Sequence, residues 1–202
     1  MIRLTAGRLL VVLGTMGLAL AAISLVALAS GPSSVGIEEV LALVLGTAEG
    51  DPAARDILLG VRLPRLVLGM LVGSALATAG AVFQALLRNP LADPYVLGVS
   101  GGAALAGIAV LALGSLWSLP TTWVPISAFA GGLLATFLLY WVAGGRGRSS
   151  ATGLLLTGVV FNAFASAGIV FIASVAGFFE GSRIFLWLIG HLSAVDIDAA
   201  GL

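Results

Sequence analysis

The chain has 202 residues, of which 60% are hydrophobic and only 9% are charged, and its formal net charge is zero. Because a soluble globular domain carries about 25% charged residues, this composition indicates an integral membrane protein. The chain has no cysteine, which excludes disulfides and thiol chemistry, and no lysine, which excludes a Walker-A phosphate loop. The balanced charge, without a basic patch, gives no indication of nucleic-acid binding.

The first apolar run covers residues 9–29 and follows two arginines, Arg3 and Arg8. Residues 27–29 have the A-x-A form of a signal-peptidase site, but the run is longer than the ~7–15 apolar residues of a signal peptide. We therefore expect a retained membrane span. Residues 30–60 are acidic and predict a water-exposed connection, within which the helical periodicity of residues 37–45 predicts a surface helix.

The second predicted span covers residues 66–87, which contain no charged residue. Roughly 20 apolar residues suffice to cross the hydrocarbon core. Small residues recur at every fourth position and would let another helix approach closely: Gly69, Gly73, Ala77 and Ala81. Asn89 should end the helix because it precedes Pro90. Asp93 and Pro94 are expected to start the next helix as N-cap and first helical residue.

Three further spans are predicted at residues 95–113, 125–142 and 151–176. Two tryptophans between the first two of them indicate a loop at the membrane–water interface. Residues 177–182 are expected to form a turn. Residues 183–192 are apolar but too short to cross, which predicts a surface helix. The predicted fold class is therefore all-α, a polytopic transmembrane helix bundle in a single domain.

Three motifs in the middle of the chain resemble one family: RLPR at residues 62–65, GAVFQALLRNPLADP at 80–94 and LGVSGGAALAG at 97–107. Together they resemble the permease subunits of the binding-protein-dependent ATP-binding-cassette (ABC) importers for iron–siderophore, haem and vitamin B12. The resemblance covers essentially the whole chain. It implies a ten-span fold, of which residues 1–202 would hold the N-terminal half and be incomplete at the C-terminus.

The resemblance also implies partners and a mechanism. Two permease subunits, identical or closely related, would work with two separate ATPase subunits and a soluble substrate-binding protein. Transport would proceed by ATP-driven alternating access across the bacterial or archaeal cytoplasmic membrane, with an iron chelate as the commonest cargo. The permease itself would be neither an enzyme nor a holder of a cofactor. The ATPase-coupling helices of the family follow its sixth span, so they cannot be assigned in this chain.

The N-terminus is expected on the cytoplasmic side. With that orientation five arginines lie inside and four outside, a small excess in the direction of the positive-inside rule. The family has the same orientation.

Arg62 and Arg65 then stand at the outer end of a span, against the positive-inside bias. They could snorkel or pair with the nearby acidic connection. The resemblance instead implies that both bind acidic residues of the external binding protein, since guanidinium–carboxylate pairs can be bidentate.

The turn between the second and third predicted spans would lie on the cytoplasmic face. It could simply fix a rigid helix–turn–helix geometry. Alternatively, it could contribute to an inner gate or contact the ATPase. The residues concerned are Arg88, Asn89, Pro90, Asp93 and Pro94.

Polar side chains within the predicted spans form a further candidate set. A buried polar group in a membrane requires a hydrogen-bonding partner or water. These residues could therefore form helix–helix hydrogen bonds, or they could line a translocation path, as the resemblance implies for the fifth span. They are Thr157, Asn162, Ser166 and Gln84.

Two other function classes compete with an importer. A secondary transporter or channel driven by an ion gradient usually carries an acidic residue within a span, and no predicted span has one. An intramembrane enzyme is disfavoured because there is no HExxH motif and no Ser–His–Asp pattern. His191 is the only histidine, and no second ligand stands near it, so neither a metal site nor a catalytic role is expected.

Overall fold

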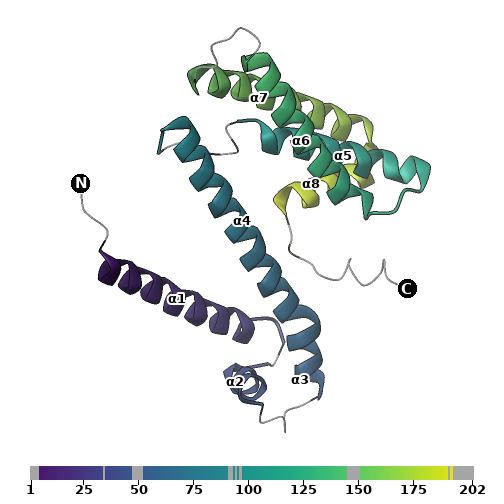
Figure 1. Ribbon diagram of the computed structural model, residues 1–202. Helices are drawn as coiled ribbons and strands as arrows, with labels where there is room; N and C mark the ends of the chain where they lie inside the picture. The colour runs from purple at the N-terminus through teal and green to yellow at the C-terminus, as the bar shows by residue number, and fades with distance from the viewer. Residues whose placement is uncertain are drawn as a thin grey trace. The chain divides into compact units, whose positions relative to one another are not determined.

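The computed structural model describes residues 5–33, 35–46, 52–90, 93, 95, 97–144, 151–190 and 192. Within these residues the regular structure is entirely helical, which confirms the predicted all-α fold class. The chain divides into two compact units, one running to Gly73 and including Leu192, the other from Ser74 to His191. Helix α4 belongs to both units (Figure 1).

The first unit holds α1 (Ala6–Ala29), α2 (Ile37–Leu45), α3 (Pro52–Ile57), the π-helical turn η1 (Leu58–Arg62) and the start of α4 (Leu63–Leu87). None of the α1 residues is buried. The small core of the unit gathers instead around the connection: Val35, Val40, Ala54 and Leu58. Residues 37–45 are helical as predicted, and their buried Val40 makes α2 an amphipathic helix that contributes to this core.

The π-helical turn has a cause in the sequence. Pro64 has no backbone N–H and, in a regular α-helix, its ring would press on the carbonyl of residue 60. The helix widens just before it, so that the Leu63 N–H bonds to the Leu58 carbonyl five residues back. Residues 52–87 therefore form one continuous helical run, beginning well before the predicted start at residue 66.

The second unit holds α5 (Val99–Trp117), α6 (Trp123–Gly144), α7 (Ala151–Val175) and α8 (Gly177–Ile189). Helices α5 and α6 approach each other closely at Gly102 and Gly131. A Cβ on Gly102 would lie 2.8 Å from the Gly131 carbonyl oxygen, and a Cβ on Gly131 would lie 2.5 Å from the Gly102 carbonyl oxygen. The two backbones are in contact because neither helix carries a side chain there.

Small residues pack two helices together within the second unit. Gly102 and Ala106 of α5 contact Ala135 and Gly131 of α6. Of the stripe predicted on α4, a Cβ on Gly69 would lie 3.6 Å from Leu192 Cδ1, and a Cβ on Gly73 would meet no described atom within 4 Å. That stripe stays a prediction.

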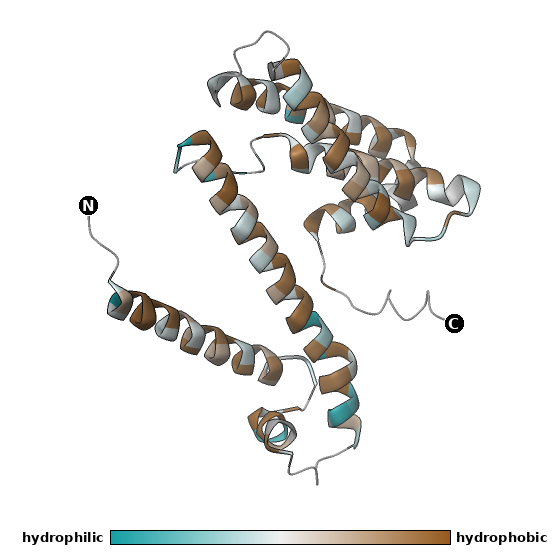
Figure 2. Ribbon diagram, viewed as in Figure 1, coloured by the Kyte–Doolittle hydropathy of each residue, from teal (hydrophilic) through white to brown (hydrophobic). Residues whose placement is uncertain are grey.

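Four helical segments are long and apolar enough to cross a membrane: Ala6–Ala29, Pro52–Leu87, Trp123–Val142 and Thr152–Val175. Val99–Gly114 of α5 is apolar but shorter. Figure 2 shows apolar positions along the length of these helices, and many large apolar side chains on them are exposed. Helices that are apolar all round suit a hydrocarbon environment or a buried site.

Two boundaries differ from prediction. The third predicted span was expected to begin at residue 95, but α5 begins at Val99, because the chain is first turned by Gly98 in the left-handed conformation (φ +84°).

Residues 177–182 were predicted as a turn but belong to α8. A single left-handed residue, Gly177 (φ +83°), accomplishes the change of direction. Helix α8 then buries Ile184, 1% exposed, against Ile108 and Ile172. This packing explains why helix extends through the polar residues before position 183.

Candidate functional site

The connection after α4 begins with a hydrogen-bonded stop. Arg88 adopts the left-handed conformation (φ 48°), its N–H bonds to the Ala85 carbonyl, and the Asn89 N–H bonds to the Gln84 carbonyl. This is the Schellman pattern, in which a residue usually glycine takes the left-handed position. The predicted helix end is confirmed, although Arg88 rather than Asn89 makes the turn. Pro90 then keeps the helix from resuming.

Further along the connection, the backbone N–H and carbonyl of Tyr95 make the hydrogen bonds of a turn. The Asp93 carboxylate accepts a hydrogen bond from the Tyr95 N–H at 2.8 Å. The Tyr95 carbonyl accepts from the Gly98 N–H at 3.2 Å, closing the turn that leads into α5. Asp93 was predicted as the N-cap of the next helix. It instead caps this local turn, and the helix starts later with Gly98 at the N-cap. Pro94 lies outside the described residues.

Asn162 of α7 joins this same peptide group from a distant part of the sequence. Its side-chain Nδ2 donates to the Tyr95 carbonyl at 2.7 Å across 67 residues of chain. Its Oδ1 is buried and has no hydrogen-bond partner among the residues that the structure describes. The structure thus brings together two predicted candidates, Asp93 of the turn and Asn162 of the path, on opposite sides of one residue that sequence reasoning did not select.

Glycines make room for this arrangement. A Cβ on Gly101 would stand 2.3 Å from Asn162 Oδ1, so only glycine leaves space for the amide. A Cβ on Gly98 would stand 3.0 Å from side-chain atoms of both Leu139 and Phe161. The LGVSGG motif, singled out for its resemblance, is therefore the surface of α5 on which α6 and α7 rest.

The other path candidates divide into two groups. The Thr157 hydroxyl donates to the Gly153 carbonyl of its own helix at 2.8 Å and is half-buried. Ser166 and Gln84 are exposed. Both side chains are therefore accessible within the second unit, to which they belong.

Arg62 is directed into its own unit. Its guanidinium donates to the Leu28 carbonyl, to Ser33 Oγ at 2.5 Å and to the Val35 carbonyl at 3.3 Å. The Leu28 carbonyl is among the last four of α1, which have no partner within the helix, and the helix dipole favours a cation there. A Cβ on Gly31 would stand 2.7 Å from Nη2, so this loop is fitted around the arginine.

Arg65 differs from Arg62 although it lies only three residues away. Its side chain is exposed, whereas Arg62 is half-buried. Of the two arginines predicted to bind a partner, Arg65 is thus the one whose side chain is presented outward. Arg62 is occupied by backbone carbonyls and a hydroxyl, partners that the prediction did not consider.

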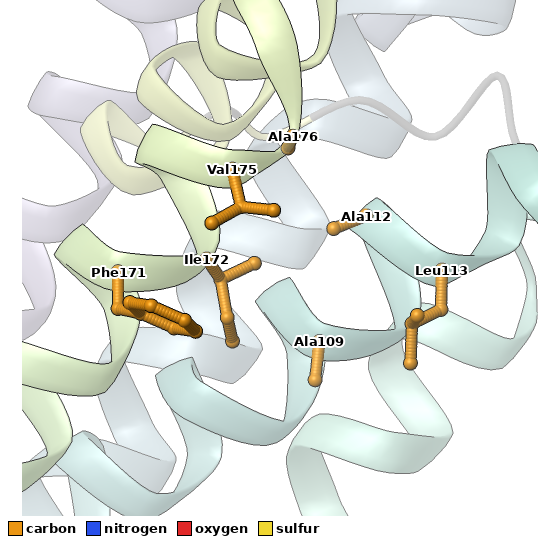
Figure 3. A pocket seen from close by; sticks show the side chains of 7 residues that line it. All are labelled: Ala109, Ala112, Leu113, Phe171, Ile172, Val175 and Ala176. Atoms are coloured by element: carbon orange, nitrogen blue, oxygen red, sulfur yellow. The ribbon is translucent and has the colours of Figure 1, made fainter.

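An apolar groove of about 290 Å³ lies between α5 and α7. Figure 3 shows Phe171, Ile172 and Val175 of α7 facing Ala109 and Leu113 of α5 across it. Its side chains supply neither hydrogen-bond donors nor acceptors, so it can offer only van der Waals contact. It is not a site that could recognise the polar groups of a ligand.

Within the described residues no group of three or more His, Cys, Asp or Glu side chains could hold a metal ion. His191 lies outside the described residues. What sequence reasoning missed are Tyr95 and Gly101. Tyr95 acts through its backbone, which leaves no trace in residue type. Gly101 could have been noticed as the additional glycine that pairs with Gly102 in the motif.

A model of the FecCD transport family matches residues 19–202. The chain is 36% identical over 174 residues to a cobalamin import system permease protein of Halobacterium salinarum, covering 85% of this chain and 42% of the relative. It is 41% identical over 145 residues to an uncharacterized ABC transporter permease protein of Bacillus subtilis, covering 71% and 41%. It is 37% identical over 180 residues to a vitamin B12 import system permease protein of Citrobacter koseri, covering 84% and 54%.

Among solved structures, an inward-facing metal-chelate type ABC transporter is similar in fold, with a TM-score of 0.69 and 25% identity. The match covers 91% of this chain and 54% of that one. The chain therefore spans about half the length of the relatives it matches.

Proposed function

The chain belongs to the FecCD transport family, and from this premise we propose that it is the membrane-spanning permease part of a binding-protein-dependent ABC importer. The match of the family model across residues 19–202 carries the proposal, because those residues include all the long apolar helices except the start of α1. Related proteins are transport permeases, which are not enzymes. The chain would supply a path and gates, and no bond chemistry.

The proposed cargo is a large metal chelate. Cobalamin is the first candidate, since two of the relatives are named for cobalamin or vitamin B12 import. An iron–siderophore or haem shares the chemistry of a metal held in an organic ligand. The resemblance in sequence motifs favours an iron chelate as the commonest cargo, and the names of the relatives move cobalamin ahead of it.

The proposed assembly contains two permease chains, two ATPase subunits and a soluble binding protein. It lies in the bacterial or archaeal cytoplasmic membrane, with the N-terminus of this chain inside and α1, α4, α5, α6 and α7 crossing. The binding protein would deliver the cargo at the outer face, where the exposed guanidinium of Arg65 can pair with carboxylates. ATP binding and hydrolysis would then alternate access between the two faces.

The proposed path runs along α7 and α4. Ser166 and Gln84 present polar groups outward from otherwise apolar helices, and small residues beside Ser166 leave room for a large cargo. Thr157 and Asn162 are half-buried, and their hydrogen bonds to the Gly153 and Tyr95 carbonyls maintain the helix and its contacts. The inner end of the path would be bordered by Arg88, Asn89, Pro90, Asp93 and Pro94.

The test is uptake into membrane vesicles that carry the assembled importer and its binding protein. Labelled cobalamin and a labelled ferric siderophore are supplied in parallel. The proposal expects uptake of one of them that requires ATP and the binding protein and that vanadate abolishes. Uptake that is insensitive to vanadate but is abolished by an uncoupler would contradict the proposal and favour a transporter driven by an ion gradient.

Native mass measurement of the gently extracted complex provides a second test. It should contain two copies each of a permease and an ATPase subunit. A permease chain that is recovered without any ATPase would contradict the proposed assembly.

A further inference from the structure

We propose that Asn162 is a positioning residue: its hydrogen bond to the Tyr95 carbonyl, the Asn162–Tyr95 link, holds the α4–α5 connection against α7 so that the two move together. The coupling role rests on the proposed function, since it assigns α7 to the path and the connection to the inner face. The link itself rests only on contacts within the second unit.

The backbone of Tyr95 is fixed from both sides. Asp93 Oδ1 accepts from its N–H at 2.8 Å, and Asn162 Nδ2 donates to its carbonyl at 2.7 Å. The carbonyl also accepts the Gly98 N–H at 3.2 Å, and the Gly98 carbonyl accepts the Gly102 N–H at 3.1 Å. Displacing α7 would therefore pull on the turn and on the first turn of α5 together.

The orientation of the Asn162 amide follows from this acceptor. Turning the amide over would set Oδ1 against the Tyr95 carbonyl oxygen, and two acceptors repel each other. Nδ2 therefore faces Tyr95, which leaves Oδ1 over Gly101 without a conventional partner. The close Cα–H groups of Gly101 offer at most a weak contact.

The unpaired Oδ1 indicates that Asn162 serves as a hydrogen-bond donor to Tyr95 and not as a packing residue. A buried acceptor without a partner costs stability, so an apolar side chain of similar volume would pack α7 on α5 at lower cost. The one thing that such a side chain cannot supply is the donor to Tyr95. The hydrogen bond to the connection, rather than helix packing, is what the asparagine adds.

The strength of the link depends on its surroundings. Asn162 is half-buried, whereas Tyr95 is 66% exposed, so water can reach the hydrogen bond and its strength is that of a bond at the surface of the bundle. Arg88 and Asn89, at the other end of the connection, are held to α4 by their own hydrogen bonds. Among the described residues of the connection, Arg88 and Asn89 are thus held to α4 and Tyr95 is held to α7 by Asn162.

The experiment measures the link in the assembled importer without any transport. This chain has no cysteine, so spin labels can be placed on it at Tyr95→Cys and Phe164→Cys, whose side chains are 66% and 80% exposed. Mixing with unlabelled chains leaves one labelled chain per complex. The Tyr95 substitution keeps the backbone carbonyl. Electron paramagnetic resonance then gives the distribution of distances between the two spin labels, one on the connection and one on α7.

We expect one narrow distance distribution in the parent and a broad one in Asn162→Ala. Asn162→Asp keeps the shape but loses the donor while ionised, and it should broaden the distribution too. Gly101→Ala should do the same by displacing the amide. The matched control is Thr136→Val, which removes a hydroxyl that bonds to the Gly132 carbonyl of its own helix. An unchanged narrow distribution in both Asn162 variants would overturn the proposal.

Coupling is measured separately, as cargo transported per ATP hydrolysed. We expect Asn162→Ala to retain hydrolysis stimulated by the binding protein and to lose transport per ATP on the order of tenfold, within the usual range of coupling between sites. A proportional loss of both activities would mean that Asn162 only stabilises the fold. If the parent transports no chelate while its distances respond to Asn162, the proposed function fails and the link stands.

Discussion

In each of the two units one polar side chain holds an irregular connection between helices, but the apolar packing around that connection differs. In the first unit the Arg62 guanidinium makes three hydrogen bonds, one to the Leu28 carbonyl at the end of α1 and two to the α1–α2 connection. Apolar packing there is sparse, since α1 buries none of its residues. In the second unit Asn162 makes a single hydrogen bond to Tyr95, and the core of this unit includes Ile108 at 0% exposure. In the densely packed second unit, one hydrogen bond only fixes the position of the connection. In the sparsely packed first unit, the hydrogen bonds of Arg62 contribute much of the stability of the connection.

The largest effect should come from breaking the dense packing of the second unit. Gly131→Ala places a Cβ 2.4 Å from the Ala106 Cβ and 2.5 Å from the Gly102 carbonyl oxygen. Overpacking of this kind costs about 1–3 kcal/mol, and backbone on the other side cannot yield easily. The melting temperature in detergent should fall by several degrees.

The neighbouring residue is the matched control. A Cβ on Gly132 would meet its nearest atoms at 3.6 Å, an ordinary contact. Gly132→Ala should be neutral or slightly stabilising, because alanine is the better helix former by up to ~1 kcal/mol. Equal melting temperatures for the two variants would show that the α5–α6 crossing is looser than described.

The next effect should come from removing the polar anchor of the first unit. Arg62→Ala leaves the Leu28 and Val35 carbonyls and the Ser33 hydroxyl without this donor. Hydrogen bonds to a charged group contribute ~1.5–3 kcal/mol, and partial exposure reduces that, so we expect a loss of about 2 kcal/mol. Hydrogen exchange at residues 28–36 should accelerate, while exchange in α5 and α6 stays unchanged.

Arg62→Lys tests the geometry of this anchor. Lysine keeps the charge but lacks the planar fork that serves several acceptors at once, so it should recover only part of the protection. Full recovery with lysine would mean that charge at the end of α1, and not the set of hydrogen bonds, holds the connection.

Arg65 should have a smaller effect, and of a different kind. Arg65→Glu alters an exposed side chain. The free energy of unfolding should therefore change by no more than the ~0.5 kcal/mol typical of surface substitutions, and the melting temperature should stay nearly constant. The proposed docking role predicts a loss of affinity for the binding protein on the order of tenfold, larger at low salt than at high salt. Binding measured at two salt concentrations checks this. An unchanged affinity would remove Arg65 from the docking surface.

The smallest stability effect should come from Asn162→Ala. It removes one hydrogen bond, worth ~0.6 kcal/mol on average between membrane helices, and it also removes the unpaired Oδ1. The two changes oppose each other, so the melting temperature should shift by no more than a degree or two. A large loss, comparable with that of Arg62→Ala, would erase the contrast between the two units.

Much of the fold follows from local sequence. The apolar runs locate a helix over each predicted span, and the Asn89-Pro90 pair predicts the end of α4. The boundaries that failed, at Val99 and Gly177, depend on single glycines whose left-handed conformation is not evident from hydropathy. The earlier start of the α4 run depends on widening at η1, which the prediction did not consider before Pro64.

The candidate residues were predicted less completely than the helices. Arg62, Asp93 and Asn162 were all selected as polar groups in unusual places, yet each has a backbone group as a partner. Residue type carries no information on a free carbonyl or N–H, because every residue has them. For the same reason Tyr95, which contributes only its peptide groups, could not have been selected.

The sequence by itself determined that this is an all-α membrane chain, where its helices lie and to which transport family its motifs are similar, because hydropathy, proline and motif order are properties of neighbours along the chain. Only the tertiary structure decided which glycines bring helices into contact, which arginine is turned inward and which peptide group Asn162 binds. Those depend on distances between residues far apart in sequence, such as the 67 residues between Tyr95 and Asn162.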